Sequence, residues 1–404
     1  MTRRCMRRGY TLKDMIVAIF VTALLFALFL PMATSPRINC RRTQCQNNLK
    51  NIALALVQYS TAHNVFPQAG TFFDDPDAHQ GDPLRSNIYK AVVSPSAFAG
   101  DPGPCRANWV VSVLPYLDQQ DLYDAWSSQK SYLSTETKDP TEPSNGLIAS
   151  TALGILRCPD DRTYQSVRGD LSYAVNGGFV RWQAVPVGWD AGSPGSQPGN
   201  GGMLRWANAG GDWRDTQGVC RKLGVMSLGT TSGDQPWDVR TRPADVVDGL
   251  SLTLMVGENT LTGASAGTPY SGGLATNWAC PLPNFSMFLA SDDVCRNGGS
   301  ATDCLGGQLR PTPKGETGAG WAWANRPGNG EAINDTRGRT VEGSFPFASS
   351  GHPGVANFAF CDGSVKSLSA TIDGSVYARI ITPAGETLPD GLRQTPVSAS
   401  EVAP

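Results

Sequence analysis

The stretch "RRGYTLKDMIVAIFVTALLFALFLPMA", residues 7–33, decides what kind of N-terminal segment the chain has. Arginines precede a run of nineteen residues without a formal charge, Met15–Ala33. This run is close to the ~20 residues that a helix needs to cross a bilayer. Because positive charge beside such a run stays on the cytoplasmic side, we expect the remainder of the chain to lie outside the cytoplasm.

Asp14 is an acidic residue at the edge of the apolar run. A carboxylate at the edge of a bilayer is costly to bury alone, and a positive partner such as the amino group of a neighbouring subunit makes it tolerable. Further along, Pro31 removes one intrahelical hydrogen bond and predicts a kink. The alternative is an ordinary secretory signal that is cleaved near "MATS" at 32–35.

The residues before the run carry a second pattern. Gly9 precedes Tyr10, and Asp14 is the fifth residue counted from Tyr10. This arrangement resembles the type IV prepilin leader, in which a prepilin peptidase cuts after the glycine and the new N-terminus is methylated. The resemblance implies that residues 1–9 are a leader, that Tyr10 becomes the methylated first residue, and that Asp14 sets register during assembly. Prepilins usually have glutamate at this position, so Asp14 shortens the reach by one methylene.

Beyond the run, residues 41–67 have the period of an amphipathic helix. Apolar residues recur at steps of four and three, which predicts one face that packs on a globular domain. Asn64 and Pro67 are expected to end this helix. We therefore expect a single long helix over residues 10–61, with a membrane span at about 15–33. The residues of the predicted apolar face are Cys45, Leu49, Ile52, Leu56 and Tyr59.

Several further blocks resemble one family in their order along residues 1–380. A large bacterial prepilin-like family, the domain of unknown function 1559 family, has similar blocks and closes with a histidine, nine residues and Asp-Gly. Here that signature corresponds to His352, Asp362 and Gly363. The blocks are "RRTQCQNNLKNIALAL" at 41–56, "VSVLPYLDQQDLYDAW" at 111–126, "LRCPDD" at 156–161, "LSYAVNGG" at 171–178, "DGLSLTLMVGEN" at 248–259 and "HPGVANFAFCDGS" at 352–364.

The closing signature also has a direct structural interpretation. Before Asp362-Gly363, phenylalanines alternate with smaller residues, and apolar residues follow the pair. This pattern predicts a β-hairpin with a type I′ turn, in which Gly363 supplies a positive φ. The segment 372–381, "IDGSVYARII", predicts a second turn and a last strand or short helix. The motif is then a turn with a packed histidine, a calcium site at Asp362 as in similar pseudopilins, or a site in which His352 is a catalytic base.

Ten cysteines are scattered along the chain without a C-x-x-C pair. This spacing argues against zinc clusters and thioredoxin-like chemistry. It fits disulfides in an oxidising compartment, and a few buried free thiols are the alternative. Cys295 and Cys304 form the candidate local disulfide, although pairing does not follow from spacing alone.

Enzyme signatures are weak. Ser265 lies in "GASAG" but lacks the strand before it and the helix after it that a nucleophile elbow needs. None of the three histidines belongs to an H-E-x-x-H motif or a Cys/His cluster. Glu258 is either a lone site acid or a salt-bridged or capping carboxylate. We therefore expect no enzymatic activity and, apart from the calcium considered at Asp362, no cofactor; a hydrolase is the third hypothesis.

Composition narrows the possible partners. A net charge of -2 and the absence of a basic stripe argue against nucleic-acid binding. The 45 glycines and 29 prolines indicate a loop-rich body. Tryptophans favour core packing, with glycan stacking as the alternative. They are Trp189, Trp206, Trp213, Trp237, Trp278, Trp321 and Trp323.

The sequence thus predicts an α+β protein in which a long pilin-like helix, first transmembrane and then amphipathic, packs on a β-rich, loop-rich head. The expected parts are a leader at 1–9, the helix at 10–61, an exported head at 62–382 and a flexible tail at 383–404. The expected role is that of a pseudopilin-like subunit, processed by a prepilin peptidase and assembled from the inner membrane into a type II secretion or type IV pilus-like filament. Its head would lie in the periplasm or on an extracellular filament, and its partners would be copies of itself or other pilin-like subunits. The alternative is a permanently membrane-anchored binding module for a glycan or another envelope ligand.

Overall fold

The structure is a computed structural model of the whole chain. It describes residues 11–29, 35–93, 95–98, 102–163, 169–179, 182, 221–235, 237–290, 321, 324–325, 327, 331–335, 341–388 and 393–402. The side chains of 26–29, 35–39, 78, 93, 96 and 97 lie outside this description.

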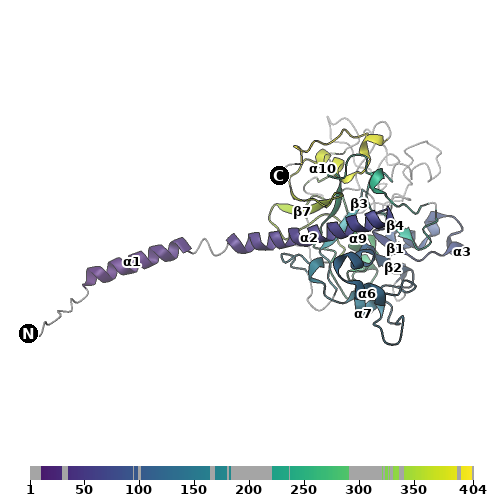
Figure 1. The fold of residues 1–404 in the computed structure, drawn as a ribbon, viewed down its shortest axis with the longest axis horizontal. Coiled ribbons are helices and arrows are strands. Elements are labelled where there is room, and N and C mark those ends of the chain that lie inside the picture. The colour runs from purple at the N-terminus through teal and green to yellow at the C-terminus, as the bar shows by residue number, and fades with distance from the viewer. Residues whose placement is uncertain are drawn as a thin grey trace, which may run out of the picture.

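Two helices open the described chain. Helix α1 spans Leu12–Phe29 and helix α2 spans Ser35–His63. Helix α1 projects away from the head, whereas α2 lies across it (Figure 1). The single helix expected over 10–61 is therefore not confirmed, and the kink at Pro31 lies outside the described residues.

Helix α2 packs on the head through the face that its period predicts. Cys45, Leu49, Ile52 and Leu56 are fully buried, and Tyr59 is half-buried. The helix ends at His63 because Asn64 takes a left-handed conformation with φ 58°. The predicted apolar face and the predicted end of the helix are both confirmed.

Two small sheets form the framework of the head. The first has the order β2-β1-β4, with β1 Gly70–Phe72 antiparallel to β2 Cys105–Asn108 and parallel to β4 Leu228–Thr230. The second has the order β6-β3-β5-β7-β8. Its strands are β3 Tyr173–Gly178, β5 Leu254–Glu258, β6 Met287–Leu289, β7 Val355–Phe360 and β8 Val365–Ser369.

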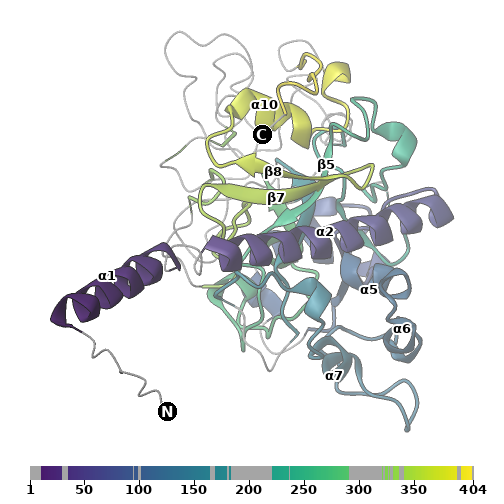
Figure 2. The same cartoon turned by 60° about the vertical axis from the view of Figure 1, so that its left-hand side comes forward.

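Short helices and turns connect these strands, and helix α2 runs between two halves of the head (Figure 2). Strands β7 and β8 and helix α10 lie on one side of α2, and helices α5, α6 and α7 lie on the other. The short α-helices are α3 Pro76–His79, α4 Asn87–Val93, α5 Trp109–Val113, α6 Gln120–Ala125, α7 Asn145–Ala149, α9 Pro283–Ser286 and α10 Gly374–Ile381. The 3₁₀ turns are η1 Pro83–Arg85, η2 Pro95–Phe98, η3 Leu114–Leu117, η4 Gly154–Leu156, η6 Pro243–Asp245, η7 Pro269–Ser271 and η11 Gly385–Thr387.

Strand β7 is covered on both faces. Ala359 belongs to the core that contains the buried face of α2, whereas Phe358 and Phe360 belong to a second core with α10. The ring of Phe358 lies 6.3 Å from that of Tyr377 on α10. Side chains alternate across a strand, so β7 forms the middle layer between the two helices.

The hairpin of β7 and β8 is confirmed, but the prediction of a type I′ turn is wrong. That turn needs a positive φ at both central residues. Gly363 has φ 81°, whereas Asp362 is absent from the positive-φ residues of the described chain. The amide of Phe360 donates to the Ser364 carbonyl, and that of Gly363 donates to the Phe360 carbonyl. The loop is therefore three residues long, 361–363, with glycine at its left-handed position.

The C-terminal segment packs on the head. Of the two structures expected for 372–381, the short helix forms, and the Asp373 side chain caps it by accepting from the amides of Ser375 and Val376. The sequence predicts a flexible tail over 383–404, whereas Leu388, Gln394 and Val402 are buried. Glu401 also pairs with Arg379 at 2.7 Å. The described residues of this segment are thus part of the fold.

The fold class is mixed α and β, as expected, with two sheets in the head. Within the described ranges, none of the helices combines the length and apolar character that crossing a membrane requires.

Candidate functional site

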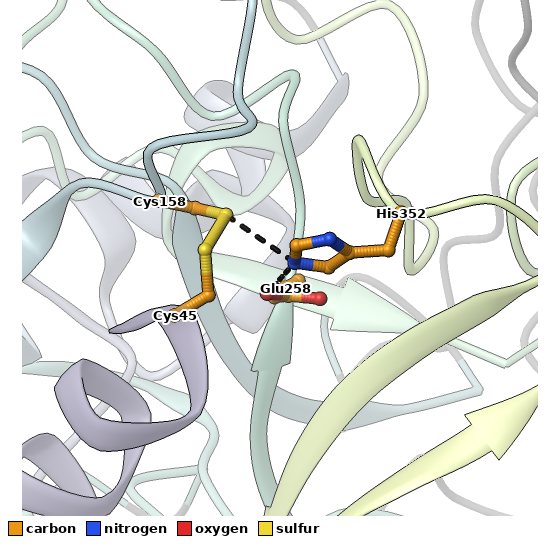
Figure 3. Close-up of side chains that lie close together, drawn as sticks. All are labelled: Cys45, Cys158, Glu258 and His352. Atoms are coloured by element: carbon orange, nitrogen blue, oxygen red, sulfur yellow. Dashed lines mark hydrogen bonds and ion pairs between the residues drawn. A yellow bond between two sulfur atoms is a disulfide. The ribbon is translucent and has the colours of Figure 1, made fainter. Parts of the chain in front are cut away.

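The densest group of chemically active side chains lies where α2 meets the head (Figure 3). His352 Nε2 lies 3.3 Å from Glu258 Oε1 and 3.6 Å from Cys158 Sγ. Cys158 forms a disulfide with Cys45 of α2. All four side chains are buried. We call these four residues the seam cluster.

Four separate elements position the seam cluster. Cys45 lies on the buried face of α2, and Cys158 follows the 3₁₀ turn η4. Glu258 is the last residue of β5, and His352 lies in the loop that leads into β7. The cluster exists only when the helix, the sheet and two loops are assembled.

The loop before His352 approaches the chain near Asp160 very closely. A Cβ at Gly351 would lie 2.0 Å from the carbonyl oxygen of Asp160, which no side chain could tolerate. Gly351 therefore lets the loop place His352 Nδ1 3.0 Å from Asp160 Oδ2.

The acids around His352 control its protonation. Burial of the ring lowers its pKa, because charge is costly away from water. The contact with Glu258 and the charges of Glu258 and Asp160 outweigh this effect, while Arg42 opposes them, so the pKa of His352 is raised above 6.5. The raised pKa favours the imidazolium form of His352, which lies between the carboxylates of Glu258 and Asp160.

A polar network connects Glu258 to the surface of α2. The amide of Asn357 donates to Glu258 Oε2 at 2.8 Å, and Asn357 Nδ2 donates to Glu258 Oε1 at 3.0 Å. Asn357 Oδ1 accepts from Ser367 Oγ at 2.6 Å and from Gln46 Nε2 of α2 at 3.3 Å. Of the two interpretations of Glu258, the paired carboxylate agrees with these contacts.

The two ends of the closing signature occupy opposite ends of β7, and both meet α2. His352 lies at the start of β7 beside the disulfide, whereas Gly363 lies after its end. Lys50 Nζ donates to the Gly363 carbonyl at 2.6 Å. The nine residues between His352 and Asp362 thus include the whole of β7. The two ends of the signature lie at opposite ends of this strand and contact α2 at two separate places.

The structure places Asp362 in the hairpin loop. Its side chain is exposed, and Asp362 Oδ1 accepts from the Ser364 amide at 2.8 Å. Among the described residues, the group able to hold a metal is the seam cluster, and Asp362 is not part of it. A calcium site formed by Asp362 with nearby loop oxygens is not tested by this grouping of His, Cys, Asp and Glu side chains, and it stays a prediction.

Other residues named from the sequence fall elsewhere. Ser265 is buried, and its hydroxyl contacts Thr276 Oγ1 at 3.0 Å. Gly9, Tyr10, Cys295 and Cys304 lie outside the described residues.

Asp14 satisfies its carboxylate within its own helix end. Asp14 Oδ2 accepts from the Thr11 amide at 2.9 Å and from Thr11 Oγ1 at 2.8 Å. A side chain that reaches back to the residue at the helix start is the acidic half of a capping box. Local capping thus gives Asp14 one role before any neighbouring subunit is considered.

Sequence reasoning missed the Cys45–Cys158 disulfide, which joins residues separated by 113 positions. One signal was available, because Cys45 lies on the predicted apolar face of the helix, and its thiol therefore faces the surface that covers this helix.

The sequence pattern of the family described as "Protein of unknown function (DUF1559)" matches residues 34–375. The chain belongs to this family. The match to DUF1559 includes all four residues of the seam cluster and the whole H-x(9)-D-G signature. Comparison with curated proteins and with solved structures gave no match.

Proposed function

We propose that this DUF1559 protein is a pilin-like structural subunit. A prepilin peptidase removes residues 1–9, and segment 15–33 holds the processed chain in the inner membrane. Copies of the chain, or other pilin-like subunits, then join it in a type II secretion or type IV pilus-like filament. The head stands in the periplasm or on the outside of the filament.

The exposure of helix α1 carries this proposal. Its apolar side chains are exposed at nine positions between Leu12 and Leu25, and the ribbon of α1 projects away from the head (Figures 1 and 2). Burying one such side chain is worth about 1.5–3 kcal/mol, so a partner surface for the helix is strongly favoured. The exposed fractions are Leu12 77%, Met15 60%, Ile16 58%, Val17 61%, Ile19 61%, Phe20 68%, Val21 46%, Leu24 53% and Leu25 48%.

The attachment of α2 supports the same role. A filament subunit is held by its helix and exposes its head. The helix and the head must therefore stay attached when force acts on the filament. The Cys45–Cys158 disulfide gives a covalent connection, and Gln46 and Lys50 add hydrogen bonds to the β7–β8 hairpin. Asn48 adds another, to the Arg157 carbonyl at 2.8 Å.

Crosslinking tests the proposal directly. A photo-crosslinking amino acid at Val17, in cells that express the chain, is expected to yield adducts between pilin-like chains. The matched control is the same probe at Leu147, which is 62% exposed on the head. Adducts only with lipid at Val17, or equal chain-to-chain adducts at both positions, would contradict filament assembly through α1.

A second candidate is the membrane-anchored envelope-binding module, and a cavity near the end of α2 favours it. This cavity has a volume of about 650 Å³. Aromatic and cationic side chains together suit a sugar ring that bears an acidic group. Trp109, Trp182, Trp237 and Trp278 are buried in the core, so they offer no face for stacking. The cavity is lined by residues that include Tyr59, Arg106, Tyr116, Tyr123, Trp126 and Lys138.

Calorimetric titration of the full chain with acidic oligosaccharides separates the two candidates. The binding module predicts saturable binding that Tyr116→Ala and Arg106→Ala weaken. Heat equal to that of dilution would rule out this class of ligand for the cavity.

A further inference from the structure

We propose that the seam cluster is a redox-gated metal site: when the Cys45–Cys158 disulfide is reduced, the two thiolates, His352 and Glu258 bind a zinc-type divalent cation. This proposal goes beyond the structural role above and does not depend on it.

The ligand atoms already have nearly the spacing of a tetrahedral zinc site. All four lie within 4.8 Å of one another. Zinc bonds of about 2.0–2.3 Å at tetrahedral angles predict roughly 3.4 Å between nitrogen and oxygen ligands and roughly 3.6 Å between nitrogen and sulfur ligands. The structure has 3.3 Å from His352 Nε2 to Glu258 Oε1 and 3.6 Å from His352 Nε2 to Cys158 Sγ. The two sulfurs are bonded to each other in the disulfide and must separate before both can bind a metal, and reduction permits that.

The surrounding residues are placed as outer partners of a metal site. A ligating histidine usually donates a hydrogen bond from its other nitrogen to a carboxylate, and His352 Nδ1 lies 3.0 Å from Asp160 Oδ2, close enough for that role although the two atoms make no hydrogen bond in the oxidised structure. The amide of Asn357 holds Glu258 Oε2, which leaves Oε1 facing His352 Nε2. The ring and the carboxylate are therefore already turned toward a common centre.

Charge also favours a bound cation in the reduced state. Two thiolates and one carboxylate in a buried space repel one another strongly, and a divalent cation compensates most of that charge. Arg41 Nη1 lies 3.2 Å from Asp160 Oδ1, so the outer carboxylate has its own partner. The choice of ion follows from the donors, because thiolate and imidazole ligands favour zinc over calcium or magnesium.

The step balances with a dithiol as the reductant. The dithiol gives two electrons and two protons to the Cys45–Cys158 bond and becomes a disulfide, leaving two thiols in the chain. Metal binding then releases two protons as the thiols become thiolate ligands, and a third proton from His352 when its ring is in the imidazolium form, because only the neutral imidazole can bind the metal. In either state α2 stays attached to the head, by a covalent bond when oxidised and through the metal when reduced.

Cobalt titration tests the proposal. The full chain in a non-ionic detergent is either kept oxidised or reduced with a phosphine, which takes oxygen from water as it cleaves the disulfide. We expect the reduced chain to give the visible absorption of tetrahedral cobalt–thiolate coordination and to bind one equivalent of Zn²⁺ by elemental analysis. The oxidised chain should do neither.

Variants locate the site. His352→Asn and Glu258→Gln, checked for folding by circular dichroism in the oxidised state, should each weaken cobalt binding more than about tenfold. Cys361→Ala removes a buried free cysteine outside the cluster and should leave binding unchanged. A reduced, folded wild-type chain without the cobalt spectrum would overturn the proposal, and so would binding that survives Cys45→Ala/Cys158→Ala.

Discussion

Removing the Cys45–Cys158 disulfide should lower the free energy of unfolding more than any other change at the surface between α2 and the head. The bond closes a loop between residues separated by 113 positions. The chain-entropy relation gives about 5 kcal/mol for a loop of this length. With an unfolding entropy of about 2.1 cal/mol/K per residue, this corresponds to a fall in melting temperature of about 6 °C for the whole chain.

The assay is thermal and urea unfolding of Cys45→Ala/Cys158→Ala in detergent, followed by circular dichroism. Cys361→Ala is the matched control, because it also removes a buried sulfur but opens no loop. The control should cost about 1 kcal/mol, as an ordinary core truncation does. Equal losses in the double variant and the control would refute the claim that this bond fastens α2.

Three further perturbations follow from the same geometry. Gly363→Ala should lower the free energy of unfolding, measured in urea, by about 1–2 kcal/mol, and Gly363→Asn should lower it by less. The reason is that Gly363 has a φ of 81°, and asparagine tolerates this left-handed region better than alanine. Equal costs for the two variants would contradict the three-residue loop with glycine at its left-handed position. Gly351→Ala should lower the free energy of unfolding by about 2 kcal/mol or more, because its Cβ would meet the Asp160 carbonyl oxygen at 2.0 Å. Gly154→Ala is the control and should cost little, because the space around that position is open. A Gly351→Ala variant as stable as the wild type would contradict the close approach of the two segments. His352 has its pKa raised above 6.5, so its contribution to stability is complete below pH 6.5 and is lost as pH rises through the folded-state pKa. The difference in unfolding free energy between wild type and His352→Asn should therefore shrink as pH rises above 6.5, and a difference that grows instead would contradict a raised pKa at His352.

Features set by neighbouring residues were predictable from the sequence. The spacing of Leu49, Ile52 and Leu56 encodes a helical face, and all three are buried on the head. The alternation around Phe358 encodes a strand, although a single glycine did not distinguish a two-residue turn from the three-residue loop that forms. The helical face, which was predicted correctly, and the hairpin loop, whose length was predicted wrongly, are both determined by residues close together in the sequence.

The seam cluster was not predictable in the same way. Its donors stand at positions 45, 158, 258 and 352, so no local spacing of the C-x-x-C or H-E-x-x-H kind connects them. Their meeting depends on α2 lying across β7 and on Gly351 allowing a close backbone approach. Tertiary packing determines these contacts, and the local spacing of residues along the sequence does not predict how the chain packs. The sequence singles out His352 and Glu258 separately, but nothing in their spacing indicates that they are in contact.

A processed pilin-like subunit that is held by its N-terminal helix must keep that helix after cleavage. The most direct measurement is mass spectrometry of the N-terminus of the protein isolated from its native membrane or filament fraction. We expect the isolated protein to begin at Tyr10 and to carry one added methyl group there, and we expect this product to be absent when Gly9 is replaced. A mature chain that begins near Ser35, without the apolar helix, would contradict this expectation.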